Sequence, residues 1–256
     1  MRIVSAQAWA LFFASIFSVS FSFSSIRTSS IHRLDNFEDL LPVVQGGGEE
    51  LVVFDIDYTL LLICDERVTP HFFSDGFNRN IAAGKSPSEA IRIQIQHFAD
   101  ICLSAPVLLT DGAIPAVWRT LLQKGVRFLL LTARTPIPVL VEATFRQLDD
   151  VGLADLVRED AWMQGYCFPE IGSDVQYEHG VLFVGNQDKG KALKALLDKI
   201  GYRPHHIYFV DDTRENLQAV GAMAEQTGIV YDGFHFTKGL VALANGYAVL
   251  HGELAC

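Results

Sequence analysis

The sequence predicts an α/β protein built on a doubly wound parallel sheet. Short apolar runs without polar alternation, typical of strands buried on both faces, recur along the chain. Segments with helical periodicity separate them, and strand and helix alternate from Val126 onward. Ligands of such sheets bind beyond the carboxyl ends of the strands. With 256 residues, 50% of them hydrophobic, the chain can form one full-sized core plus an insertion.

The first elements are a short helix and a strand. Residues 34–44 indicate a short helix that ends near Pro42, and Gly46-Gly47-Gly48 then breaks the chain. The run Leu51-Val52-Val53-Phe54 has no polar alternation and predicts the first buried strand.

The remaining core elements follow the same two patterns. Apolar runs predict strands at 126–132, 181–184, 206–210 and 229–231. Helical periodicity predicts helices at 114–124, 136–148, 191–200 and 215–224. Thr135 is the candidate N-cap of the second helix, while Gly125 and Gly201 follow the first and third.

Residues 61–110 do not fit this alternation. The segment Ser86-Pro87-Ser88-Glu89 is a capping box that leads into a helix. One face of that helix would carry Ile91, Ile95, Phe98 and Cys102. The alternation of isoleucines at 91, 93 and 95 also permits a strand. We interpret residues 61–110 as a small helical cap inserted into a core formed by residues 34–60 and 111–256.

The charge distribution excludes some partners. The formal net charge is −10, and no run of five or more Lys and Arg occurs, so nucleic acid is not expected as a partner. Small phosphorylated substrates remain compatible because local charge can oppose net charge. The chain lacks the Gly-x-Gly-x-x-Gly pattern of dinucleotide-binding oxidoreductases and the glycine-rich loop of P-loop nucleotidases.

Residues 1–25 predict a signal peptide. No charged residue occurs between Arg2 and Arg27, and the stretch from Ala8 to Phe23 is mostly apolar. Small residues suited to cleavage stand at Ser18, Ser20, Ser22 and Ser24. The protein is therefore expected to be exported, either periplasmic or secreted. One alternative is an uncleaved membrane anchor, and another is a buried N-terminal helix. We expect contact with a membrane only if the segment is uncleaved.

The four cysteines are too widely spaced for a zinc site. Export would permit disulfides, and Cys64 and Cys102 would both lie in the insertion. Buried free thiols are the alternative.

An acidic pair follows the first strand. Asp55 and Asp57 are two residues apart in extended chain and project from the same side of the backbone. Carboxylates so placed repel each other unless a cation or a shared proton holds them. Solvated loop aspartates that cap a helix are the alternative interpretation.

Three residues later in the sequence, Thr132, Arg134 and Lys189, could together form a phosphate site. Thr132 closes a predicted strand, and its hydroxyl, the next backbone amides and the Arg134 guanidinium would form a phosphate cradle. Lys189 lies near a helix N-terminus, where a cation is disfavoured, so an acidic group should face it. Alternatively, Thr132 simply ends the strand and Arg134 is a charge on the surface. Lys191 or Lys194 could take the role given to Lys189.

A second acidic pair, Asp211-Asp212, ends the strand predicted at 206–210. Two adjacent carboxylates at the end of an apolar strand require a counter-ion. Oxygen ligands with no His or Cys between them suit Mg²⁺.

Together these residues resemble the four motifs of the haloacid dehalogenase superfamily, in the same order. The motifs are Asp-x-Asp-x-Thr at 55–59, Thr132, Lys189 and Asp211-Asp212. The resemblance covers residues 50–235 and is closest to a subgroup of exported bacterial proteins. It implies a Rossmann-like core with a cap, and Mg²⁺-dependent hydrolysis of phosphomonoesters.

The resemblance also implies roles. Asp55 would be the nucleophile and Asp57 the general acid and base. Mg²⁺ would bind the Asp55 carboxylate, the Asp57 carbonyl and Asp211, with Asp212 direct or through water. Thr132 and Lys189 would bind the transferring phosphoryl group.

The resemblance further implies that an acid at position 57 favours phosphatase over dehalogenase chemistry in this superfamily, and Thr59 agrees with the phosphatase pattern. Tyr58 and Asn216 depart from the motifs and are expected to reshape substrate access. Phosphoryl transfer to another acceptor, and a binding protein that has lost turnover, are the alternative functions.

Overall fold

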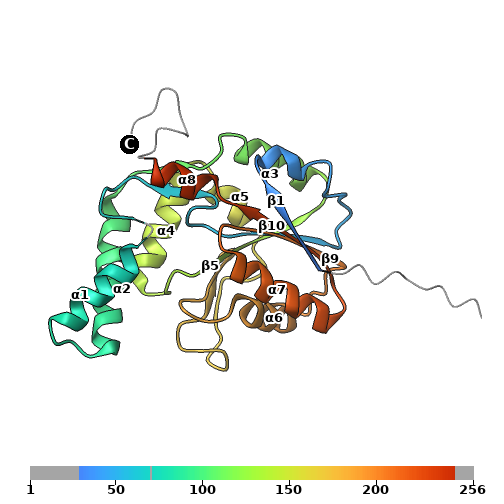
Figure 1. Cartoon of the computed structure of the whole chain (residues 1–256). Helices are drawn as coiled ribbons and strands as arrows, with labels where there is room; N and C mark the ends of the chain where they lie inside the picture. The colour runs from blue at the N-terminus through green and yellow to red at the C-terminus, as the bar shows by residue number, and fades with distance from the viewer. Residues whose placement is uncertain (1–28, 70, 246–256) are drawn as a thin grey trace, which may run out of the picture.

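The computed structural model describes residues 29–69 and 71–245, which fold around one mostly parallel sheet (Figure 1). In spatial order its strands are β1 (Ser30–Leu34), β10 (Val230–Phe236), β9 (His206–Asp211), β2 (Glu50–Phe54), β5 (Arg127–Thr132), β8 (Val181–Phe183), β7 (Gln176–Glu178) and β6 (Gly165–Cys167). Neighbours from β1 to β8 pair in parallel, whereas β7 and β6 form an antiparallel edge. The predicted doubly wound α/β fold is confirmed. The predicted signal peptide at 1–25 lies outside the described residues.

The order in which strands are added to the sheet reverses at β2. From β2 the chain builds β5 and β8 on one side, and it then crosses to β9 and β10 on the other. A reversal of this kind opens a crevice at the carboxyl ends of the strands, because the connections leave in opposite directions. The residues that follow β2 and β9 therefore meet at one point.

Helices cover both faces of the sheet (Figure 1). The 3-10 helix η1 (Phe37–Leu40), α3 (Ile114–Gln123) and α5 (Ala154–Glu159) share an apolar cluster with Val52 and Phe54 of β2. On the opposite face, α6 (Lys189–Ile200) and α7 (Arg214–Thr227) share a second cluster with Leu51 and Val53. Because side chains alternate along a strand, β2 is buried on both faces, as its unbroken apolar run predicts.

Strands β2, β5, β8, β9 and β10 correspond to the five predicted strands, and α3, α4 (Pro138–Asp150), α6 and α7 to the four predicted core helices. Two helix starts differ. Ile137, not Thr135, occupies the N-cap of α4. Helix α6 begins at Lys189 rather than at Lys191, because the Asp188 side chain accepts a hydrogen bond from the Lys191 amide at 2.8 Å.

The short helix predicted at 34–44 is wrong in extent. Residues 30–34 form β1, which pairs in parallel with β10, and only Phe37–Leu40 is helical. Phe37 contacts Phe54 and Phe236, with ring centroids 5.6 and 4.9 Å apart. These tertiary contacts with distant segments outweigh the local helical pattern.

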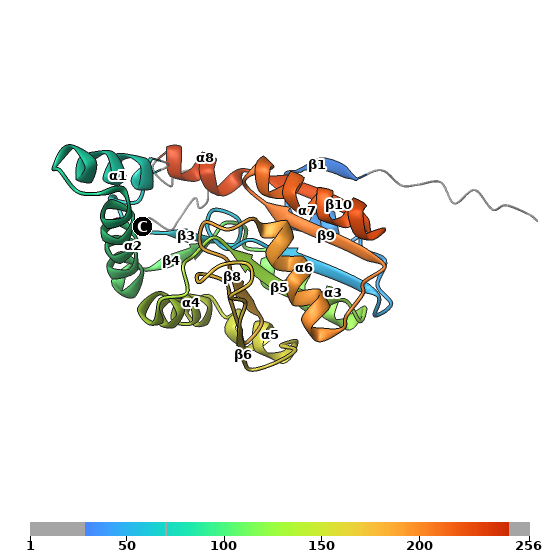
Figure 2. The same ribbon diagram turned by 90° about the horizontal axis from the view of Figure 1, so that it is seen from below.

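The inserted segment 61–110 begins and ends in paired strands. Strands β3 (Leu61–Ile63) and β4 (Val107–Leu109) form an antiparallel ribbon, which leads to α1 (Phe72–Ala82) and α2 (Pro87–Ser104). Helix α2 spans the isoleucines that also permitted a strand, and its N-cap Ser86 accepts a hydrogen bond from the Glu89 amide. Both helices project from one end of the sheet, where α2 packs against α4 (Figure 2).

The predicted pairing of Cys64 with Cys102 is wrong. Cys64 is disulfide-bonded, whereas Cys102 and Cys167 carry free thiols. Cys102 is buried between α2 and α4, and its carbonyl accepts a hydrogen bond from the Gln147 side chain at 3.2 Å. This burial raises the pKa of the Cys102 thiol to about 11.

No helix within residues 29–69 and 71–245 combines the length and the apolarity that a membrane span requires.

Candidate active site

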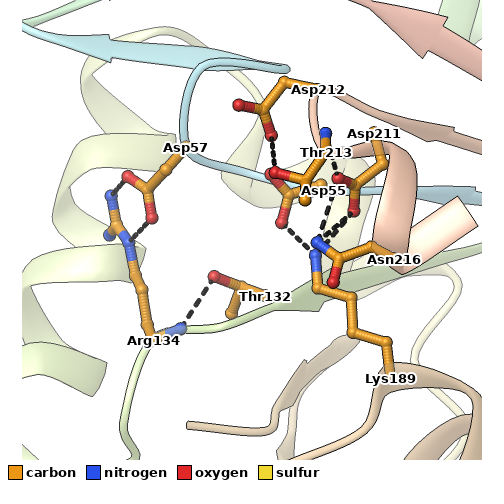
Figure 3. A network of polar contacts seen from close by, with 9 residues as sticks. All are labelled: Asp55, Asp57, Thr132, Arg134, Lys189, Asp211, Asp212, Thr213 and Asn216. Atoms are coloured by element: carbon orange, nitrogen blue, oxygen red, sulfur yellow. Dashed lines mark hydrogen bonds and ion pairs between the residues drawn. The ribbon is translucent and has the colours of Figure 1, made fainter. Parts of the chain in front are cut away.

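Acidic residues from two adjacent strands meet at the crevice (Figure 3). Asp55 directly follows β2, and Asp211 is the last residue of β9. The Asp55 amide donates to the Val210 carbonyl at 3.0 Å, which continues the β2–β9 pairing up to the carboxylate. Asp55, Asp211 and Asp212 place carboxylate oxygens within 4.8 Å of one another.

Lys189 joins the two strand ends. Its Nζ lies 2.5 Å from Asp55 Oδ1 and 2.8 Å from Asp211 Oδ2. Burial alone would lower the pKa of Lys189, but the charges of Asp211 and Asp55 raise it above its usual value. The expectation that an acidic group faces Lys189 is confirmed. Lys194, an alternative to Lys189, pairs instead with Asp198 on the exposed face of α6.

Asp211 is fully buried and held by several donors. The Thr213 amide donates to its Oδ1 at 2.7 Å, and Asn216 Nδ2 lies 3.1 and 3.2 Å from its two oxygens. Asn216, noted in the sequence as a departure from the motif, thus fixes the orientation of Asp211. Its place in the first turn of α7, five residues after Asp211, was the available signal for this contact.

Burial and mutual repulsion disfavour the charged forms of Asp55 and Asp212. Burial raises the pKa of Asp55 to about 7, opposed by the charge of Lys189 and reinforced by those of Asp211 and Asp57. Burial and the charges of Asp55 and Asp211 raise the pKa of Asp212 to about 8. A divalent cation among these oxygens would stabilise the charged forms. The oxygen-only donor set fits Mg²⁺.

Asp57 lies apart from this cluster and pairs with Arg134 (Figure 3). Arg134 Nε and Nη2 donate to the two Asp57 oxygens at 2.9 and 2.7 Å, and Nη1 donates to Thr144 Oγ1 at 2.9 Å. The Arg134 side chain is 1% exposed, so it is not a surface charge. Its donors are held by protein groups, and its predicted contact with phosphate stays a prediction.

Thr132 ends β5 and is fully buried. Its Oγ1 accepts a hydrogen bond from the Arg134 amide at 3.2 Å, so the hydroxyl orders the turn that carries Arg134. This contact agrees with a strand-ending role. The predicted role of Thr132 in phosphate binding remains a prediction.

A cavity of about 610 Å³ opens over these groups. Asp55, Asp57, Arg134, Lys189 and Asp212 line one part of it. Residues of α1, α2, α4 and α8 (Lys238–Ala244) line another part, so the inserted helices contribute to the wall. A pocket of this size accommodates a small organic molecule.

Comparison with solved structures finds distant likenesses. A haloacid dehalogenase-like family hydrolase of Streptococcus pneumoniae has 13% identity and a TM-score of 0.44, covering 76% of this chain and 97% of that one. A protein of Thermotoga maritima, provisionally titled a β-phosphoglucomutase, has 12% identity and a TM-score of 0.37, covering 77% and 99%. Both scores are below 0.5 and decide nothing about activity.

Comparison of sequences finds a relative and a family. A Chlamydia pneumoniae protein, with the provisional name of outer membrane protein, is 22% identical over 230 residues, which are 90% of this chain and 84% of the relative. Residues 33–241 match the model of a family described as protein of unknown function, DUF2608. Because this match spans most of the chain, including every site residue described above, the protein belongs to the DUF2608 family.

Proposed function

We propose that the protein is a Mg²⁺-dependent phosphomonoester hydrolase of the haloacid dehalogenase type, with Asp55 as its nucleophile. The observation that carries this proposal is the position of the Asp55 carboxylate. It lies at the carboxyl end of the central strand, 2.5 Å from the Lys189 ammonium, among the acids Asp211 and Asp212, and it lines the cavity. A carboxylate held beside a buried cation and further acids is suited to in-line attack on a phosphoryl group.

The reaction divides into two displacements. In the first, an Asp55 oxygen bonds to phosphorus while the ester bond breaks, and Asp57 gives a proton to the departing alkoxide. In the second, Asp57 takes a proton from water, whose oxygen attacks phosphorus and releases phosphate from Asp55. Asp57 thereby returns to its initial protonation state, and Asp55 is regenerated.

The surrounding side chains prepare these steps. Arg134 fixes the plane of the Asp57 carboxylate through two hydrogen bonds, one to each oxygen. One of these bonds must be released before that oxygen can carry the proton that Asp57 gives to the leaving group. Lys189 offsets the charge of Asp55 and Asp211 and would contact the phosphoryl oxygens together with Thr132. Asn216 and the Thr213 amide hold Asp211 in place.

The metal site would be formed by Asp55, Asp211 and Asp212 with the Asp57 carbonyl. The close carboxylates and the raised pKa values of Asp55 and Asp212 support this assignment. When bound, Mg²⁺ neutralises charge between the nucleophile and the phosphoryl oxygens.

We also propose that the protein is exported to the periplasm or secreted. The uncharged segment between Arg2 and Arg27 supports export, as does the disulfide of Cys64, because disulfides persist in oxidising compartments. The partner would be a small phosphorylated molecule. The net charge of −10 makes nucleic acid an unfavourable one.

The test is a panel of phosphomonoesters, assayed with and without Mg²⁺, for the protein and for Asp55→Asn. We expect Mg²⁺-dependent release of phosphate that the substitution lowers by about a thousandfold or more, because the nucleophile is lost. Asp198→Asn, an equal change on the exposed face of α6, is the matched control and should keep full activity.

Thermal unfolding supplies a readout besides activity. Mg²⁺ should raise the unfolding temperature, because it binds the folded state alone. A folded, Mg²⁺-stabilised protein that hydrolyses no ester would contradict the hydrolase and favour an interaction protein. Phosphate appearing on an added alcohol rather than in water would favour a phosphotransferase.

A further inference from the structure

The cavity over Asp55 has walls of two kinds. Its charged part consists of the side chains assigned above to catalysis and metal binding. Its other wall is apolar and comes from α1, α2, α4 and α8, through Phe73, Ile91, Ile95, Phe98, Leu140 and Leu240. A ligand with its phosphoryl group at Asp55 would therefore extend its remaining atoms across aliphatic and aromatic side chains.

Helix α2 supplies the centre of this apolar wall. Ile91, Ile95 and Phe98 lie at helical spacing on one face of α2, and all three line the cavity. Phe98 is buried against Phe73 of α1, with ring centroids 5.1 Å apart. The predicted face of α2 thus serves the cavity, whereas Cys102 at its far end is buried against α4.

Two side chains of this wall have the highest exposed fractions among the exposed large apolar residues in the described part of the chain. Phe73 is 49% exposed and Ile91 is 47% exposed. Both line the cavity, so a ligand that fills it can cover them and gain hydrophobic free energy. The same two residues would be a solubility liability if nothing covered them.

The charges that line the cavity exclude a polyanionic ligand. Within the described part of the chain, the cations that line it are Arg134 and Lys189. Arg134 is engaged by Asp57, and Lys189 by Asp55 and Asp211. Lys189 is assigned above to the transferring phosphoryl group and Arg134 to Asp57, so the lining offers no further cation for a second phosphate or a carboxylate, and such a group would meet the apolar wall unpaired.

We propose that the substrate is the phosphomonoester of an apolar alcohol, whose hydrocarbon part lies against the wall formed by α1 and α2. This inference rests on the proposed function. The phosphoryl group is the one strongly polar part of this ligand. A cavity of about 610 Å³ leaves room for a hydrocarbon part of medium size beside it.

Binding of alkylphosphonates tests this substrate class without relying on turnover. Calorimetry with ethyl-, butyl-, hexyl- and octylphosphonate in the presence of Mg²⁺ should show affinity rising about fourfold per methylene until the cavity is full. Hexane-1,6-bisphosphonate should bind more weakly than hexylphosphonate. An affinity that is independent of chain length, or tighter binding of the bisphosphonate, would overturn the proposal.

A matched pair of variants on α2 locates the contact. Ile91→Ser should weaken hexylphosphonate binding roughly fivefold and leave ethylphosphonate nearly unaffected. Leu103→Ser changes a similarly exposed apolar residue of α2 that does not line the cavity, and it should bind both ligands normally. Equal effects of the two substitutions would overturn the assignment of the wall.

Hydrolysis of the matching alkyl phosphates separates this inference from the proposed function. Chain-length-dependent affinity without release of phosphate would overturn the hydrolase and leave the apolar site standing. Hydrolysis of glycerol phosphate and hexyl phosphate with equal kcat/KM would leave the hydrolase standing and overturn the apolar substrate.

Discussion

Arg134 has a buried guanidinium, each of whose three nitrogens donates to a protein acceptor. Two of its nitrogens donate to Asp57 and a third donates to Thr144. The charge of Asp57 therefore compensates a cation that would otherwise be buried without a counter-ion, which is among the more costly situations in a protein interior.

We expect a double-mutant cycle on Arg134→Met and Asp57→Asn to give a coupling free energy of about 2 kcal/mol in urea unfolding. Each single substitution leaves one charge without its partner, whereas the double variant removes both. The same cycle on Lys194 and Asp198, an exposed pair of α6, should give about 0.5 kcal/mol or less. Equal coupling in the two pairs would contradict the energetic role of the buried one.

The sequence predicts the acidic cluster of the site better than its surroundings. Asp55, Lys189 and Asp211 stand at strand ends and a helix start, which parallel topology brings to one edge of the sheet. The pairing of Asp57 with Arg134 was not predicted, because Arg134 follows β5, a different strand from the one that Asp57 follows, and lies 77 residues further along the chain. No local pattern in the sequence links two side chains on different strand ends.

At the scale of elements, Asp232 ties three strands together. It lies in β10, and its carboxylate contacts Ser30 and His32 of β1 and His206 of β9. The hydrogen bond with His206, aided by those with Ser30 and His32, holds the pKa of Asp232 well below its usual range, although partial burial opposes the shift.

This lowered pKa predicts the direction of a pH effect. The carboxylate contributes stability above its unfolded-state pKa of about 4, and the contribution is lost as the pH falls through the folded-state pKa. We expect Asp232→Asn to lower the free energy of unfolding by about 1–3 kcal/mol at pH 7, and by progressively less below pH 4.

Urea midpoints measured between pH 7 and pH 3 would show this convergence of the two proteins. Asp35→Asn is the control, since Asp35 pairs with Arg33 on an exposed surface and should have little effect at any pH. A deficit of Asp232→Asn that is the same at pH 3 and pH 7 would contradict the linkage.

Strand β1 shows why part of the fold was missed. Its sequence, Ser-Ile-His-Arg-Leu, mixes polar and apolar residues, and most of its side chains are not buried. Its stability comes from pairing with β10, two hundred residues away, and from the contacts of Asp232. Of the strands that were predicted, β2, β5, β8 and β9 are buried on both faces, because burial selects an unbroken apolar run.

For the whole molecule, export is expected to remove the N-terminal segment and to leave Cys64 in a disulfide. If the chain passes through an export pathway, its exported form should lack Met1 and Arg2 by intact mass. Its Cys64 should resist maleimide under denaturing conditions until a reductant is added, while Cys102 and Cys167 react at once.

A chain that starts after residue 25 and stays in the cytoplasm of the same host is the control, and its Cys64 should react without reductant. An exported protein with an intact Met1 would contradict the cleaved signal peptide. A reactive Cys64 in that protein would contradict passage through an oxidising compartment.

The ribbon of β3 and β4 has a consequence for how such proteins diversify. Both ends of the segment that carries α1 and α2 pass through three residue pairs, Leu61–Leu109, Leu62–Leu108 and Ile63–Val107. A segment of different length or shape must match that narrow junction and the face of α4 against which α2 packs. The part of the cavity wall that α1 and α2 supply can therefore change with this segment while the sheet that carries Asp55 stays as it is.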